Sequence, residues 1–199
     1  MLKIKKCVRI MNQKILLDNL KRKSKNIMKD GKHFHDFAHV MGVYKNVEKL
    51  LKYEKDNRIV LLTSALFHDI ERDCKNHGIK GARSVKKILN SIPEFPKNLI
   101  SPVSQIIKVH DKKPKTKNEK LFYDADKMDA FNELAVVRSF MMYAINGLSL
   151  KKACFEYVNL IDYFYKQLNT PIAKKLTLIH YKKARNFARK LAKCYEIDS

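Results

Sequence analysis

Apolar residues recur every three or four positions over most of this chain, which is the spacing of one face of an α-helix. The first clear stripe includes Phe37, Val40 and Tyr44, and it follows Asp36, a residue type that caps helix N-termini. Residues 58–68, RIVLLTSALFH, are apolar on nearly all sides, as a central helix or a buried strand would be. The length of this segment and its ALF ending favour the helix.

The rest of the chain repeats this pattern between turn signals. Asn146-Gly147 is typical of a helix end, and Thr170-Pro171 is typical of a helix start. The Lys- and Pro-rich run from Asp111 to Asn118 indicates a solvated loop. The sequence shows no alternating strand of useful length and no internal repeat. We therefore predict an all-α, single-domain helical bundle, with helices within 1–29 and over 36–51, 58–68, 78–90, 99–110, 119–145, 149–168 and 171–195.

Composition places the chain among soluble globular proteins. Its 199 residues are enough for one domain with a real core, and 45% of them are hydrophobic, which excludes disordered and fibrous classes. We expect a basic helical extension over 1–29 and the main domain over 30–196. The four cysteines form no CxxC pair, so we expect reduced thiols. Charged residues interrupt the N-terminus before any signal-peptide core, and no window is long and apolar enough to span a membrane. We expect a cytoplasmic protein with no membrane partner.

The chain also carries a large positive charge. Lys and Arg number 42 against 20 Asp and Glu, which gives a net charge of +22. A basic field attracts phosphate-bearing ligands and nucleic acid alike, although a Lys-rich composition also occurs without such a role. The lysines are spread along the whole sequence, and the densest segments are 21–25 and 112–117.

Histidines and carboxylates on three predicted elements are the candidate chemistry. His39 lies on an early helix, His68 and Asp69 end the most apolar helix, and Asp126 lies in the later segment YDADKMDA. Imidazole nitrogens with carboxylate oxygens suit Mn, Fe, Co, Ni or Zn, and they accept Mg where substrate phosphates help. Such a divalent metal ion lowers the pKa of bound water and neutralises phosphoryl oxygens, as phosphoester hydrolysis requires.

Three motifs carry a family resemblance. The segments HFHDFAHVMGVY at 33–44, LLTSALFHDIERD at 61–73 and LFYDADKMDAF at 121–131 resemble the HD-domain metal-dependent phosphohydrolases in order, separation and apolar flanks. The likeness is greatest to small stand-alone members with HDxxH near the N-terminus and DADxxD later, and it spans roughly residues 30–195. The resemblance implies an all-α bundle whose metal ligands are His39, His68, Asp69 and Asp126.

Further site residues are predicted around these ligands. The resemblance implies that His77 and His110 line the cleft as acid or electrostatic partners. Asp73, four residues after Asp69, is a candidate general base, with Glu71 as a rival. Cationic side chains that suit phosphate binding are Arg72, Lys127 and Arg138.

Two departures from the family pattern bear on the substrate. Gly42 stands where HxxRV in relatives has an Arg, so one phosphate contact is lost or supplied elsewhere. Glu71 stands where relatives often have Gly after the His-Asp doublet, which alters the turn beside the site.

Three functions are compatible with these observations. The first is a metal-dependent phosphohydrolase acting on a small phosphorylated substrate, a nucleotide above all. The second is a nuclease on single-stranded nucleic acid, with residues 21–25 and 111–118 as its basic track. The third is a non-catalytic, basic nucleic-acid-binding module with a structural metal. The predicted ligand set with open coordination positions favours an enzyme.

Overall fold

A computed structural model describes the backbone of residues 2–28 and 36–195 and the side chains of residues 11–28 and 36–195. Within these ranges every regular element is a helix, so the predicted all-α fold is confirmed. The chain forms two compact units, Met1–Phe122 and Tyr123–Ser199, and helix α6 (Lys117–Met128) crosses the boundary between them. The predicted boundary between an extension and a domain at residues 29 and 30 lies outside the described residues.

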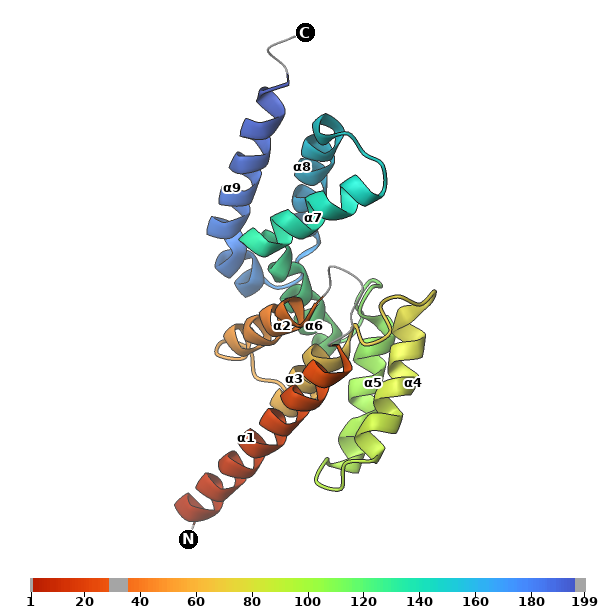
Figure 1. Cartoon of the computed structure of the whole chain (residues 1–199). Helices are drawn as coiled ribbons and strands as arrows, with labels where there is room; N and C mark the ends of the chain where they lie inside the picture. Colours follow the sequence, from red (N-terminus) through yellow and green to blue (C-terminus); the bar gives the residue numbers. More distant parts are fainter. Residues whose placement is uncertain (1, 29–35, 196–199) are drawn as a thin grey trace. The chain divides into compact units, whose positions relative to one another are not determined.

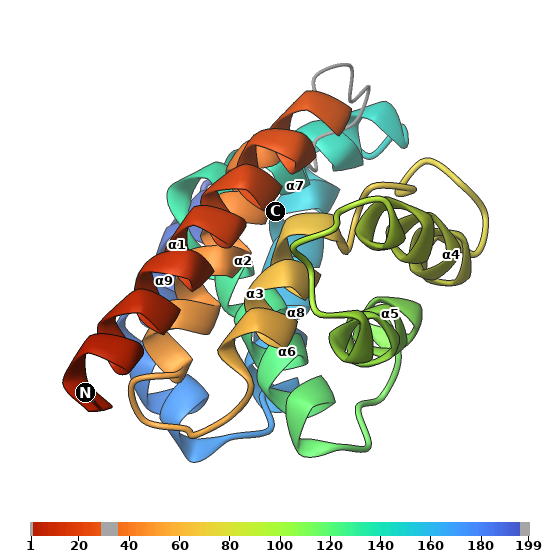
Figure 2. The same ribbon diagram turned by 90° about the horizontal axis from the view of Figure 1, so that it is seen from below.

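Helix α3 (Arg58–Phe67) is the centre of the first unit. It packs against α1 (Leu2–Ile27), α2 (Phe37–Leu50) and α5 (Ile100–Val109), as Figures 1 and 2 show. All but the first of its residues are buried, which explains why its sequence is apolar on nearly all sides. The predicted helix, rather than a buried strand, is therefore confirmed.

Two closely packed helices flank this centre. Helix α4 (His77–Asn90) lies beside α5, and the 3-10 helix η1 (Lys97–Leu99) leads into α5 (Figure 1). The approach is close because α4 presents glycine to α5: a Cβ added at Gly78 would lie 3.0 Å from the carbonyl oxygen of Lys108. The hydroxyl of Ser104 also donates to the carbonyl of Ala82 at 3.0 Å.

The single helix predicted over 119–145 is wrong. Helix α6 begins at Lys117, two residues before the predicted start, and ends at Met128; the 3-10 helix η2 (Asp129–Phe131) follows, and α7 (Glu133–Ile145) is a separate helix. Asn132 causes the break because its backbone is extended (φ −89°, ψ 166°) and its side chain accepts from the Ala135 amide as an N-cap. Asp126 consequently lies in the last turn of α6 and not within a single helix that runs to residue 145.

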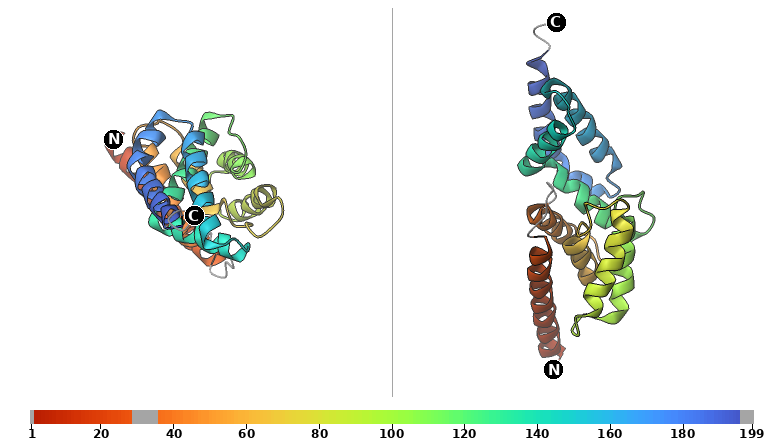
Figure 3. Two further views of the ribbon diagram at one scale, coloured as in Figure 1. Left: turned by 90° about the horizontal axis from the view of Figure 1, so that it is seen from above. Right: turned by 45° about the vertical axis from the view of Figure 1, so that its right-hand side comes forward.

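The second unit joins α7 to α8 (Leu150–Gln167) and α9 (Pro171–Lys193), with α8 and α9 side by side in Figures 1 and 3. Its core gathers Phe131, Tyr157, Ile161, Ala184 and Ala188. The predicted start of α9 is confirmed, because the Thr170 side chain accepts from the Ala173 amide as the N-cap and Pro171 opens the first turn. Asp162 on α8 pairs with Arg185 on α9 at 2.7 Å.

Two findings concern side-chain chemistry and membranes. Among residues with described side chains, Cys74, Cys154 and Cys194 are free thiols, which agrees with the expectation of reduced cysteines. Over the part of the chain that the structure describes, none of the helices combines the length and apolar composition that crossing a bilayer requires.

Asp124, the first carboxylate of the DADxxD motif, contacts the turn before α9. Asp124 is fully buried and accepts from the backbone amides of Asn169 and Thr170, at 2.7 and 2.8 Å, and from the Thr170 hydroxyl at 2.7 Å. It therefore joins α6 to the turn that starts α9.

We expect Asp124→Ala to lower the free energy of unfolding by about 3 kcal/mol, because it leaves the backbone amides of Asn169 and Thr170 without their buried, charged acceptor. Asp124→Asn retains one acceptor oxygen, so its loss is smaller. The measurement is the urea unfolding curve. Asp18→Ala, which removes an exposed carboxylate paired with Lys21 at 3.4 Å, is the control and shifts the curve by less than about 0.5 kcal/mol. An Asp124→Ala curve that overlays the control would contradict this assignment.

Candidate metal centre

The local fold brings the first three predicted ligands together. Asp36 caps α2 by accepting from the amides of Ala38 and His39, so α2 starts two residues before His39. His68 is the C-cap of α3, and Asp69 opens the turn that follows. All three side chains are buried although imidazole and carboxylate groups are polar.

Three donor atoms converge in this first triad. The Nε2 atoms of His39 and His68 are 3.1 Å apart, and Asp69 Oδ2 lies 3.7 Å from His39 Nε2 and 3.5 Å from His68 Nε2. His68 Nδ1 is 3.0 Å from the Ala65 carbonyl, which only accepts, so Nδ1 carries the proton. In the neutral ring Nε2 then presents a lone pair toward a carboxylate oxygen, an arrangement that a cation between them stabilises. The donor set fits a divalent metal ion.

A second triad shares the same carboxylate. His77, the first residue of α4, and His110, the C-cap of α5, have Nε2 atoms 3.3 Å apart. His110 Nε2 lies 3.4 Å from Asp69 Oδ1, and His110 Nδ1 donates to the Ile107 carbonyl at 2.7 Å. Both triads have donor atoms spaced closely enough to hold a metal ion. The structure thus brings the predicted His77 and His110 to the predicted ligands.

Asp69 is the electrostatic centre of both triads. Burial alone raises the pKa of its carboxyl, but the neighbouring His68, His110, Arg72 and His39 hold that pKa well below its ordinary value. Its Oδ1 is buried and finds no well-aligned hydrogen-bond donor among the described residues. The carboxylate is therefore charged at neutral pH and has an oxygen to offer to a cation.

His77 is the member of the cluster closest to solvent. Its burial, His110 and Arg72 lower the pKa of the imidazole below the ordinary value. Because the neutral ring is the form that binds metal ions, this environment favours a ligand or acceptor role at neutral pH.

The predicted carboxylates of the turn have different surroundings. Asp73, the candidate general base, is exposed. Glu71, its rival, accepts from the Ser84 hydroxyl at 2.6 Å and from the Cys74 thiol at 3.6 Å, so it joins the turn to α4.

The remaining predicted residues belong to the second unit. Lys127 pairs with Asp126 at 2.9 Å, and its ammonium lies 5.1 Å from the centres of the Tyr123 and Phe164 rings. Arg138 donates to Asp129 at 2.7 Å, and the same carboxylate accepts from Asn132. Two of the three predicted phosphate-binding cations are thus paired with carboxylates of the DADxxD motif.

Sequence reasoning missed the side chains and glycines that set the positions of the ligands. Phe122 presents its ring to His68 in an edge contact with the centroids 5.6 Å apart. Gly78 and Gly81 let α4 approach α5, which positions His77 beside His110. The spacing of the two glycines on one helix face was the available signal for this approach.

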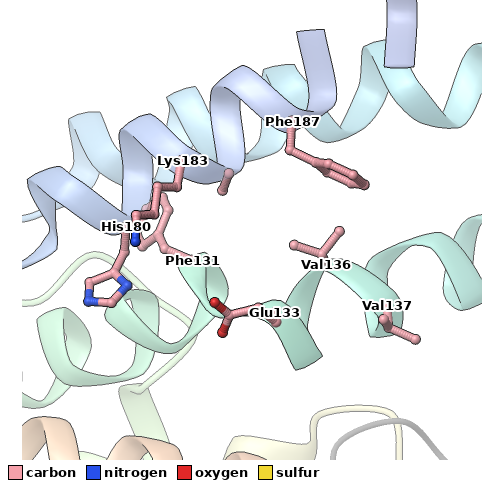
Figure 4. A pocket seen from close by; sticks show the side chains of 8 residues that line it. Phe131, Glu133, Val136, Val137, His180, Lys183 and Phe187 are labelled. Atoms are coloured by element: carbon pink, nitrogen blue, oxygen red, sulfur yellow. The ribbon is translucent and has the colours of Figure 1, made fainter. Parts of the chain in front are cut away.

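The second unit contains an open groove of about 370 Å³. It is lined by Phe131, Glu133, Val136, Val137, His180, Lys183, Ala184 and Phe187, from η2, α7 and α9 (Figure 4). The lining is largely apolar and contains none of the predicted site residues.

Comparison with known proteins agrees with this geometry. The model of the HD domain family matches residues 36–130, the range that contains both triads. Residues 36–130 match an HD domain. The predicted family resemblance and HD-type helical fold are therefore confirmed, whereas the assignment to the small HDxxH and DADxxD branch stays a prediction.

Solved structures show the same fold over most of this chain. YpgQ from Bacillus subtilis, in its complex with ADP, is 21% identical with a TM-score of 0.73, over 92% of this chain and 96% of that one. An HD-superfamily hydrolase from Bacillus thuringiensis is 19% identical with a TM-score of 0.69, over 92% and 98%. A predicted HD superfamily hydrolase from an uncultured Thermotogales bacterium is 21% identical with a TM-score of 0.63, over 90% and 91%. No curated protein matches the sequence.

We expect Gly78→Ala to destabilise the protein by about 1–3 kcal/mol, because the new methyl group meets backbone carbonyl oxygens of Lys108 and Ile107 at 3.0 and 3.1 Å. Gly81→Ala is the matched control, since its nearest neighbour is the Ile107 side-chain methyl at 3.2 Å, which is able to shift. Both substitutions gain the same helix propensity. Urea unfolding compares them, and equal stabilities of the two variants would refute the close backbone approach.

Proposed function

We propose that this HD-domain protein is a metal-dependent phosphohydrolase that hydrolyses a phosphoester or phosphoanhydride of a nucleotide. The observation that carries the proposal is the buried first triad, in which two imidazole nitrogens and a carboxylate oxygen face one another. Burying three such groups costs free energy unless a cation or hydrogen bonds compensate. A structural role would not require the open coordination positions that a three-residue set leaves.

His39, His68 and Asp69 would hold the metal ion, and Asp126 completes the proposed set as the sequence resemblance implies. A divalent ion in such a site lowers the pKa of a water ligand and neutralises charge on phosphoryl oxygens. The protein contributes orientation, because the Ala65 carbonyl fixes the tautomer of His68 and the Asp36 cap fixes the first turn of α2. The native metal is one of Mn, Fe, Co, Ni, Zn or Mg by the chemistry of these donors.

The other predicted residues have proposed roles around this centre. His77 and His110 act as acid or electrostatic partners, and the exposed Asp73 takes protons as a general base. Cationic side chains proposed to contact the substrate phosphate are Arg72, Lys127 and Arg138. The ADP complex of YpgQ supports a nucleotide substrate, and the net charge of +22 favours a polyanion over a neutral molecule.

The first test is the metal content of the purified protein by elemental analysis, followed by phosphate release from a panel of nucleotides with Mn, Co, Ni or Mg. We expect near-stoichiometric metal and turnover of one nucleotide class. His68→Ala, Asp69→Ala and Asp126→Ala each lose metal and lower turnover by more than about 100-fold, since even substitutions of groups that merely orient ligands cost 10- to 100-fold. His180→Ala removes an exposed imidazole of the second unit and is the matched control. Circular dichroism checks that each variant retains its helices.

An oligonucleotide substrate in the same assay separates the alternatives. Metal-dependent shortening of single-stranded nucleic acid, with no nucleotide turnover, would identify a nuclease. Absence of metal under every loading condition, together with salt-sensitive oligonucleotide binding, would replace the phosphohydrolase by a basic binding module.

A further inference from the structure

Three acceptor atoms meet in the second triad. His110 Nδ1 donates to a carbonyl, so in the neutral ring His110 Nε2 carries a lone pair. That lone pair faces Asp69 Oδ1 at 3.4 Å and His77 Nε2 at 3.3 Å. An arrangement of acceptors at these distances repels itself unless a positive group lies among them.

The guanidinium of Arg72 lies at this place. Its Nη1 is 3.3 Å from His77 Nε2 and 3.6 Å from Asp69 Oδ1. A guanidinium only donates, so His77 Nε2 is the acceptor of this contact and presents its lone pair to Arg72. One nitrogen of Arg72 thus approaches two of the three atoms that would otherwise coordinate an ion.

The backbone holds Arg72 in this position. Its amide donates to the Asp69 carbonyl at 3.1 Å, which closes a tight turn between the two residues. Glu71 anchors the same turn to α4 through Ser84 at 2.6 Å. The side chain of Arg72 is 36% exposed, so one edge of the guanidinium contacts the triad while the group still reaches solvent.

The first triad meets the same carboxylate through its other oxygen. His39, His68 and Asp69 Oδ2 face one another, and Arg72 approaches Asp69 through Oδ1, the oxygen of the other triad. The two oxygens of one carboxylate therefore serve two positive groups of different kinds.

We propose that Arg72 is a built-in cation that occupies the second triad, so that this HD domain binds one divalent metal ion where its ligands would otherwise hold two. The inference rests on the proposed metal dependence of the site. Because arginine stays protonated at every pH at which proteins fold, this positive charge is permanent and no chelator removes it. The outer donors of Arg72 are then available to a phosphoryl oxygen of the substrate, where a second metal ion would otherwise bind.

The test is the number of Mn²⁺ ions bound per chain, measured by equilibrium dialysis with elemental analysis and by electron paramagnetic resonance. We expect the wild-type protein to bind one equivalent and to give the spectrum of an isolated ion. Arg72→Ala and Arg72→Gln open the second triad, so each binds a second equivalent, and two ions sharing Asp69 give an exchange-coupled spectrum. Arg72→Lys retains a cation and stays at one equivalent. Arg83→Ala removes an exposed arginine of α4 and is the control.

The outcomes separate this inference from the proposed function. Two equivalents in the wild-type protein would overturn the role of Arg72 and leave the metal-dependent enzyme standing. One equivalent in both Arg72→Ala and Arg72→Gln, with folded protein by circular dichroism, would also overturn it. No bound Mn²⁺ or other divalent metal in the wild-type protein would instead refute the proposed function itself.

Discussion

A buried, ionised carboxylate at Asp69 is the constraint on which the first unit depends. A charge taken out of water is costly unless positive groups or hydrogen-bond donors surround it, and only 4% of Asp69 is exposed. Four elements supply its neighbours: α2 brings His39, α3 brings His68, α5 brings His110, and the turn after α3 brings Arg72. The helices of this unit therefore converge on the carboxylate, and the low pKa of its carboxyl records the sum of their effects.

The sequence predicted this unit well because its signals are local. Helix α3 is apolar on nearly all sides, and such a helix is stable only at the centre of a bundle, so its C-terminal His68 and Asp69 had to lie inside the protein. Asp36 is a recognisable N-cap that places His39 in the first turn of α2. The sequence did not predict how close the side chains of the two triads lie to one another. Both triads share Asp69 because of how α4 and α5 pack, and Gly78 was only a weak indication of that packing.

The segment after α5 was harder to predict for a physical reason. Residues 119–145 contain neither Gly nor Pro, and Leu, Ala, Phe and Met favour helix throughout, so composition gave no reason for a break. The break depends on one side chain, because Asn132 caps α7 and also donates to Asp129 at 2.7 Å. Likewise, the three aspartates of DADxxD are the same residue type, and only their partners distinguish them: Asp124 accepts from Asn169 and Thr170, and Asp129 pairs with Arg138.

The net positive charge of the chain and the single positive charge of Arg72 act over different distances and have different effects. The net charge of +22 is spread over the chain and acts over roughly a Debye length, about 8 Å at physiological salt, so it raises the local concentration of anions without selecting among them. Arg72 acts at 3.3–3.6 Å, against the buried carboxylate of Asp69, where orientation matters. A guanidinium at this position differs from a metal ion because it does not coordinate a water molecule. It neutralises phosphoryl charge through directed hydrogen bonds, but it has no coordination site at which to lower the pKa of a water molecule. Under the proposed function, the nucleophile is therefore activated on the side of Asp69 that faces His39 and His68, and Arg72 contacts the phosphate on the other side.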